Sequence, residues 1–270
     1  MVDDTSAPEL SQLARASSGG VPAQRYGTIT IVGGGCYGSY YLRQLHRGRR
    51  AKAIDWQRLV VVDRDPACRV AGALGAGTSD GCELATADWD DYFDRELGAL
   101  AGRGVRPDDP RDAIVPSPLM PHLALSWIER RARARFGVAA VQRLPLTVPP
   151  PTPWQRAGSD GTHYASYATW TCPVNCIEPV RCPMTRGHRA WSMPDAMRFY
   201  VESLPDDQRL LGPLVFHCSH RAYGVGMIDS DDIVAADRFV ADHGARGHAE
   251  FLVATVSHCH GALGRLVVDG

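Results

Sequence analysis

Three cysteines gather in a short stretch of the second half of the chain, at Cys172, Cys176 and Cys182. Thiolates are soft ligands that suit zinc and iron–sulfur clusters. The prolines that follow the first and third cysteine stiffen the loop that would carry them. The spacing C-x3-C-x5-C matches neither a standard zinc finger nor a standard ferredoxin. It predicts a metal site and leaves iron–sulfur and zinc open, with buried inert thiols or redox thiols as alternatives.

Such a site needs a fourth ligand, and two more cysteines are candidates. Cys218 and Cys259 each follow an apolar run that is typical of a strand. Ligands of open α/β sheets bind at the carboxyl ends of strands, so both cysteines are predicted metal ligands. His188, shortly after the cysteine cluster, is a further candidate for the fourth position.

Histidines flank the same two cysteines, in the segments 217–220 and 258–260. Histidine titrates near neutral pH and serves as acid, base or metal ligand. If both preceding strands join one parallel sheet, the two segments end at the same edge and meet in one pocket. We therefore expect His258 and His260 to handle protons as catalytic residues.

A glycine-rich segment near the start of the chain carries the pattern G-x-G-x-x-G at Gly33, Gly35 and Gly38. It follows a β-branched run and precedes a helical pattern. The first glycine permits a tight turn, the second lets the backbone approach a pyrophosphate, and the third allows close packing of helix on strand. The helix N-terminus adds unpaired N–H groups and a positive dipole.

The second apolar run ends in Asp63, at the position where a dinucleotide-binding unit carries a carboxylate. There it would accept hydrogen bonds from ribose hydroxyls, which favours NAD, although the adjacent Arg64 leaves NADP open. The predicted cofactor-binding residues are Gly33, Gly34, Gly35, Cys36, Tyr37, Gly38, Asp63 and Arg64.

On these residues, the segment 28–66 resembles the Rossmann-fold NAD(P)-binding superfamily. It is similar to the dehydrogenases and to the NAD-binding regulatory domains of potassium channels and transporters, in which an Asp-x-Asp-Pro turn follows the second strand. Here that turn is 63–66. The resemblance implies dinucleotide binding and does not identify an activity. We recognise no characterised family in residues 150–270.

Ubiquitin-activating-type adenylating enzymes share this layout and bind ATP. Asp63 and Asp65 fit their Asp-x-Asp motif. Residues 66–76 lack the Asn/Arg/Gln cluster of that family, and its paired C-x-x-C motifs are absent. An ATP-dependent adenylating enzyme is therefore the lesser alternative.

Strands and helices are expected to alternate through the first half, which predicts an α/β fold with a doubly wound, mostly parallel sheet. The expected strands are 28–32, 59–62, 82–88, 112–115, 214–216 and 251–256. The expected helices are 37–47, 90–100, 122–136 and 195–204.

The proline-rich segment 145–160 suggests a boundary. We expect a flexible tail over 1–26, a dinucleotide-binding domain over 27–145, and a Cys/His-rich region over 146–270 that either extends the same sheet or forms its own domain.

Composition sets few limits on function. The formal net charge is -1, with 44% hydrophobic residues, which indicates neither nucleic-acid nor membrane binding. No apolar run reaches the roughly 18 residues of a membrane span, and no secretory signal is recognisable, so we expect a cytoplasmic protein. The leading hypothesis is an NAD(P)-binding oxidoreductase that acts on a small-molecule substrate or redox partner. The main alternative is a non-enzymatic NAD- or redox-sensing module.

Overall fold

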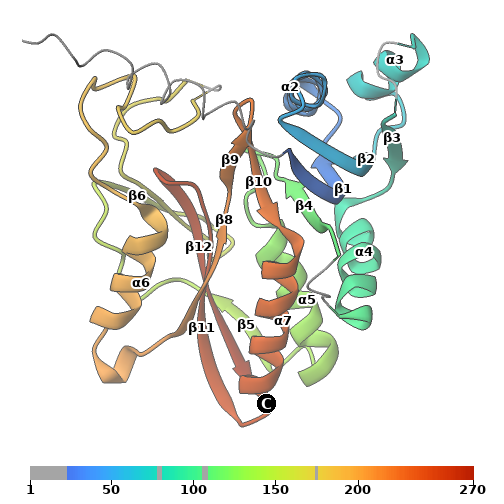
Figure 1. Ribbon diagram of the computed structural model, residues 1–270. Coiled ribbons are helices and arrows are strands. Elements are labelled where there is room, and N and C mark those ends of the chain that lie inside the picture. Colours follow the sequence, from blue (N-terminus) through green and yellow to red (C-terminus); the bar gives the residue numbers. More distant parts are fainter. Residues whose placement is uncertain (1–22, 78–80, 105–108, 174–175) are drawn as a thin grey trace, which may run out of the picture.

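The computed structural model describes residues 23–77, 81–104, 109–173 and 176–270, and its first sheet has the strand order β3-β2-β1-β4-β10-β9 (Figure 1). The first four of these strands are parallel, β10 pairs antiparallel with β4, and β9 pairs antiparallel with β10. The strands are β1 (Gln24–Val32), β2 (Ile54–Asp63), β3 (Glu83–Thr86), β4 (Arg111–Val115), β9 (Ser219–Ala222) and β10 (Val225–Asp229).

Helices cover both faces of this sheet. The side chains of β1 and β2 alternate between two apolar clusters, so Ile31 packs toward one helix layer and Val32 toward the other. On one side lie α2 (Cys36–Arg50) and α3 (Arg69–Gly75). On the other lie α4 (Trp89–Arg103), α5 (Leu123–Phe136) and α7 (Ser230–Gly244). The predicted α/β class with a mostly parallel, Rossmann-like sheet is confirmed.

A second, mixed sheet has the order β6-β7-β12-β11-β8, with β5 paired to β12. Its strands are β5 (Val141–Leu144), β6 (Trp154–Ala157), β7 (His163–Ser166), β8 (Leu211–His217), β11 (His248–Val256) and β12 (His260–Asp269). The helix α6 (Met193–Ser203) covers its outer face, and a 3-10 turn, η1 (Asp206–Gln208), precedes β8.

The two strands before the histidine–cysteine segments lie in the second sheet, which decides between the two arrangements that the sequence left open. β8 and β11 are parallel to each other in the second sheet, where His217 is in register with Val256. The other edge of β11 is occupied by β12 along its whole length. Beyond Cys218 the chain continues into β9, which pairs with β10 at the edge of the first sheet. The two segments therefore end side by side at the junction between the sheets.

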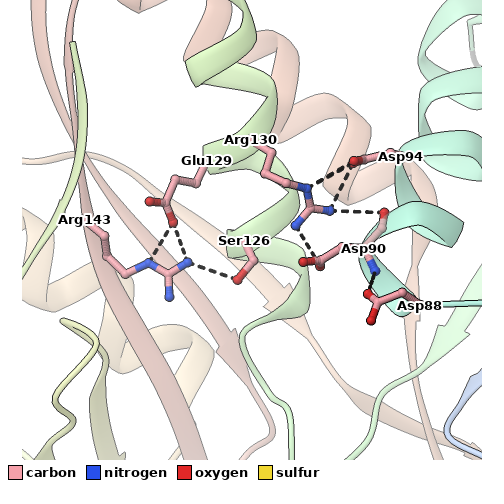
Figure 2. Close-up of polar contacts among 7 residues, drawn as sticks. All are labelled: Asp88, Asp90, Asp94, Ser126, Glu129, Arg130 and Arg143. Atoms are coloured by element: carbon pink, nitrogen blue, oxygen red, sulfur yellow. Dashed lines mark hydrogen bonds and ion pairs between the residues drawn. The ribbon is translucent and has the colours of Figure 1, made fainter. Parts of the chain in front are cut away.

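The helices α5 and α7 lie between the two sheets, so a single apolar cluster includes Val62 of the first sheet and Phe251 of the second. Polar contacts tie α5 to both sides (Figure 2). Arg130 pairs with Asp94 of α4, and Arg143 of β5 pairs with Glu129 at 2.6 Å. Strands from both sides of the expected boundary at 145 thus share one core. Among the described residues, no helix is long and apolar enough to cross a membrane.

Candidate functional site

The glycine-rich segment forms the predicted turn between β1 and α2. The N–H of Gly33, which has a φ of +87°, donates to the carbonyl of Val62 at 2.9 Å. A Cβ on Gly38 would lie 1.8 Å from the carbonyl oxygen of Gly33, so only glycine lets the helix approach the strand this closely. A Cβ on Gly35 would meet no atom within 4 Å, so the space above the second glycine is open.

Asp63 closes this turn from the end of β2. Its Oδ2 accepts the N–H of Gly34 at 2.6 Å, and its Oδ1 accepts the N–H of Asp65 at 2.9 Å. The neighbouring Arg64 places its guanidinium 5.8 Å from the centre of the Trp89 ring. In the first turn of α2, Cys36 is exposed and Tyr37 is half-buried.

Four cysteines line one small cavity, namely Cys172, Cys176, Cys182 and Cys259. The first three come from the loop between β7 and α6, and the fourth comes from the turn between β11 and β12. Of the two predicted candidates for the fourth position, Cys259 lies here, while Cys218 lines a different cavity. Residues 174 and 175, within the cysteine loop, lie outside the described part of the chain.

Hydrogen bonds reach three of these sulfur atoms. The N–H of Glu178 donates to Sγ of Cys176 at 3.4 Å, and the indole N–H of Trp191 donates to Sγ of Cys259 at 3.3 Å. The backbone N–H of Thr185 lowers the pKa of Cys182, whereas burial raises the pKa of Cys172 and raises that of Cys259 to about 11. Across the described ranges, no three His, Cys, Asp or Glu side chains stand close enough together to hold a single metal ion.

A buried carboxylate that the sequence reasoning missed, Glu178, joins the cysteine loop to the β11–β12 turn. Its Oε1 accepts from Ser257 Oγ at 2.6 Å and from the N–H of Cys259 at 3.1 Å, and its Oε2 accepts the N–H of His258 at 2.8 Å. Burial alone would raise the pKa of Glu178, but the hydrogen bonds from Ser257 and His258 outweigh it and leave that pKa below its usual value. The only available signal was its position as the one acid between Cys176 and Cys182.

The two histidine segments meet beside this carboxylate. The rings of His217 and His258 lie 4.8 Å apart, and Nδ1 of His220 lies 3.7 Å from Oε2 of Glu178. Burial lowers the pKa of His217 and of His220. Within the described residues, Nε2 of His217 and Nδ1 of His258 are buried and have no hydrogen-bond partner.

His260 is held by β7. Its Nδ1 lies 2.9 Å from Oγ of Ser166, whose hydroxyl donates to the carbonyl of Ala168 at 2.8 Å. With that hydrogen directed at the carbonyl, Ser166 accepts from His260, so Nδ1 carries the ring proton and Nε2 keeps a free lone pair. Partial burial lowers the pKa of His260, so the ring is neutral at neutral pH.

A larger cavity of about 380 Å³ lies between the two sheets. It is lined by Tyr41 of α2, by the loop 116–121 that follows β4, and by Cys218, Ser257 and His260 at the ends of β8, β11 and β12. Strand order reverses between β1 and β4, and open α/β sheets bind ligands outside the carboxyl ends of the strands at such a point.

Fold and site together define an α/β protein that has a Rossmann-like sheet, a second mixed sheet, and a Cys/His-rich junction between them. A family model described as "Uncharacterized protein, C-terminal domain" matches residues 124–269, just over half of the chain. The chain belongs to this family. The match runs from α5 to the end of β12, so it contains the cysteine loop, Glu178 and both histidine segments. No curated protein and no solved structure matches the chain.

Proposed function

We propose that this protein is an oxidoreductase that binds NAD at the turn formed by Gly33–Gly38 and reacts its substrate in the cavity between the two sheets. The observation that carries the proposal is the composition of that cavity wall. The helix that starts at the glycine-rich turn contributes Tyr41, and the ends of three C-terminal strands contribute Cys218, Ser257 and His260. A dinucleotide-binding element and candidate proton-transfer groups thus line one space.

Three features of the turn support this. Gly35 leaves open space for a pyrophosphate, and α2 has no acidic residue in its first turn to repel one. Each oxygen of Asp63 accepts one backbone N–H and keeps a second lone pair that a ribose hydroxyl could use. Arg64 is engaged over Trp89, which favours NAD over NADP because a 2′-phosphate would lack that cation. When bound, the nicotinamide supplies hydride transfer.

We propose an iron–sulfur cluster rather than a single zinc ion for the cysteine cavity, because a cluster is held by thiolates that lie further apart than the four ligands of one zinc ion. Four cysteines line one cavity, and the N–H of Thr185 lowers the pKa of Cys182, which favours its thiolate form. A single zinc ion needs ligands gathered within bonding distance of one point, and the described side chains show no such group. A bound cluster would supply one-electron transfer.

The protein's own acid–base group in this scheme is His260. Ser166 holds its Nδ1 proton, so the lone pair of Nε2 is available to accept a proton from a substrate hydroxyl in the cavity. The ring of His258 packs against that of His217, and its backbone N–H donates to Glu178. His258 thus helps to orient the same turn.

Two measurements on anaerobically purified protein test the proposal. Titration calorimetry should show that NADH binds more tightly than NADPH or ATP, and that Gly35→Val abolishes this binding by filling the open space. Gly98→Val, on α4, is the matched control, since a Cβ there also meets no atom within 4 Å, and it should bind NADH normally. Tighter binding of ATP would overturn the proposal in favour of adenylation.

Metal analysis is the second measurement. Iron and sulfide should be present in the wild type and lost together in Cys172→Ser, while Cys36→Ser, at the exposed cysteine of α2, should keep both. Stoichiometric zinc in place of iron would refute the cluster assignment. Dinucleotide binding without turnover of any substrate would instead identify a sensing module.

A further inference from the structure

The cavity between the two sheets has no charged wall. Among the described residues that line it there is no Asp, Glu, Lys or Arg. Much of its surface comes from the prolines of the loop 116–121, from Val256 and from Ala262. Its polar groups are hydroxyls, the thiol of Cys218 and the ring of His260.

The phenol and the thiol among these polar groups are uncharged at neutral pH. Burial raises the pKa of Tyr41 to about 12 and that of Cys218 to about 12, so the phenol and the thiol keep their protons. Ser166 accepts the Nδ1 hydrogen of His260, which leaves a lone pair at Nε2. A carboxylate or phosphate that entered this cavity would lose its hydration and gain no cationic partner, which is strongly unfavourable.

We propose that this cavity binds a small, uncharged and largely apolar molecule that carries one hydroxyl or carbonyl oxygen. Its volume of about 380 Å³ suits a molecule with one or two rings. A ligand carbonyl would accept the hydroxyl hydrogen of Tyr41, and a ligand hydroxyl could instead donate to Nε2 of His260. The rest of the molecule would lie against proline and aliphatic side chains. As a statement about a substrate, this rests on the proposed oxidoreductase function.

A pair of probes that share one ring system and differ in charge provides the test. Binding of 2-naphthylmethanol and of 2-naphthoate to the full-length protein is measured by ligand-observed NMR at neutral pH. The alcohol should bind, and the carboxylate should bind more weakly by about tenfold or more. Equal or tighter binding of the carboxylate would overturn the proposal.

Substitutions in the cavity wall locate the binding. Ser117→Arg brings a cation to the wall and should strengthen naphthoate binding by about tenfold, while Ser117→Leu, the matched uncharged variant, should leave it weak. Tyr41→Trp reduces the volume and should weaken binding of the alcohol. Melting temperatures establish that each variant is folded. If none of the folded variants alters the binding of either probe, the probes bind elsewhere and the proposal is wrong.

An NADH titration on the same samples separates the two proposals. If the alcohol binds in the cavity and NADH does not bind, the cavity assignment stands and the oxidoreductase proposal fails. If NADH binds and the cavity prefers the carboxylate, the substrate class is wrong and the dinucleotide site stands.

Discussion

At the scale of single residues, the glycine-rich turn depends on glycines, which have no side chain. Gly38 and Gly35 belong to the same motif and have different surroundings. A Cβ on Gly38 would overlap a backbone carbonyl, and a Cβ on Gly35 would meet only open space. Gly38 is therefore needed for the packing of the helix on the strand, and Gly35 leaves space for a ligand.

Gly38→Ala should destabilise the protein by about 1–3 kcal/mol, because Gly33 and the first turn of α2 must move apart to admit the methyl group. Gly72→Ala in α3 is the matched control, since its Cβ would meet no atom within 4 Å. It should stabilise the protein by roughly 0.5–1 kcal/mol through helix propensity. Denaturant unfolding measures both. Equal effects of the two variants would contradict this account of the turn.

At the scale of elements, a buried carboxylate helps to attach the cysteine loop to the β11–β12 turn. Glu178 accepts three hydrogen bonds from residues 257–259 and is almost fully buried, with 6% of its side chain exposed. Displacing this side chain would release the loop that carries Cys176 and Cys182 from the turn that carries Cys259.

Glu178→Gln should cost roughly 1.5–3 kcal/mol at neutral pH, since the amide removes the charge that faces these donors and turns an N–H group toward one of them. The pKa of Glu178 is lowered in the folded protein, so its contribution is present above the unfolded value of about 4.3 and is lost as pH falls through the folded value. The stability difference between wild type and variant should shrink in acid. The exposed Glu202→Gln should show no such difference, and a constant gap for Glu178→Gln would refute the assignment.

The paired histidines at the ends of β8 and β11 should make the protein sensitive to mild acid. The pKa of His217 is lowered by burial and by the neighbouring His258, so the folded state favours the neutral ring. Its contribution is present above the unfolded pKa of about 6.5 and declines as pH falls below it. His217→Gln should flatten that decline in unfolding free energy.

His248 gives the control with the opposite sign. Its pKa is raised by the hydrogen bond to Asp269, so its contribution is present below the unfolded pKa and is lost as pH rises through the folded value. Because His248 is solvent-exposed, the effect of His248→Gln should be small. Identical pH profiles for the His217 variant and the wild type would show that His217 does not titrate as described.

At the scale of the whole molecule, the two sheets are held together through the helices between them. Asp237 of α7 is 1% exposed and receives two bonds of 2.6 Å from Arg135 of α5, with Arg131 at 3.3 Å. A substitution in this ion pair should therefore disturb the packing of α5 and α7, the helices on which both sheets pack.

Asp237→Ala should destabilise the whole protein by about 3–5 kcal/mol, because it leaves the partly buried Arg135 without its carboxylate. The double variant Asp237→Leu with Arg135→Leu should recover much of this loss, since apolar replacement of both partners is often neutral. Asp195→Ala, which breaks an exposed pair with Arg198, should change stability by less than about 1 kcal/mol. Thermal unfolding followed by far-UV circular dichroism checks all three. A double variant as unstable as Asp237→Ala would contradict the explanation.

The sequence by itself determined the parts of this protein that rest on local pattern. The β-branched run before Gly33, the helical spacing after Gly38 and the acid at the end of the second strand predicted the first βαβ unit and, with it, the α/β class. These signals are local because strand, turn and helix are adjacent in the chain, and each glycine acts on its immediate backbone neighbours.

Only the tertiary structure decided which strands pair and which side chains meet. A buried strand such as β11 reads as a continuous apolar run in whichever sheet it lies, so its pattern cannot name its partners. For that reason the sequence could not place β8 and β11 in the second sheet, or distinguish Cys259 from Cys218 as the fourth cysteine of the small cavity. The sequence could not identify Glu178 either, because its hydrogen-bond donors lie some 80 residues away in the chain.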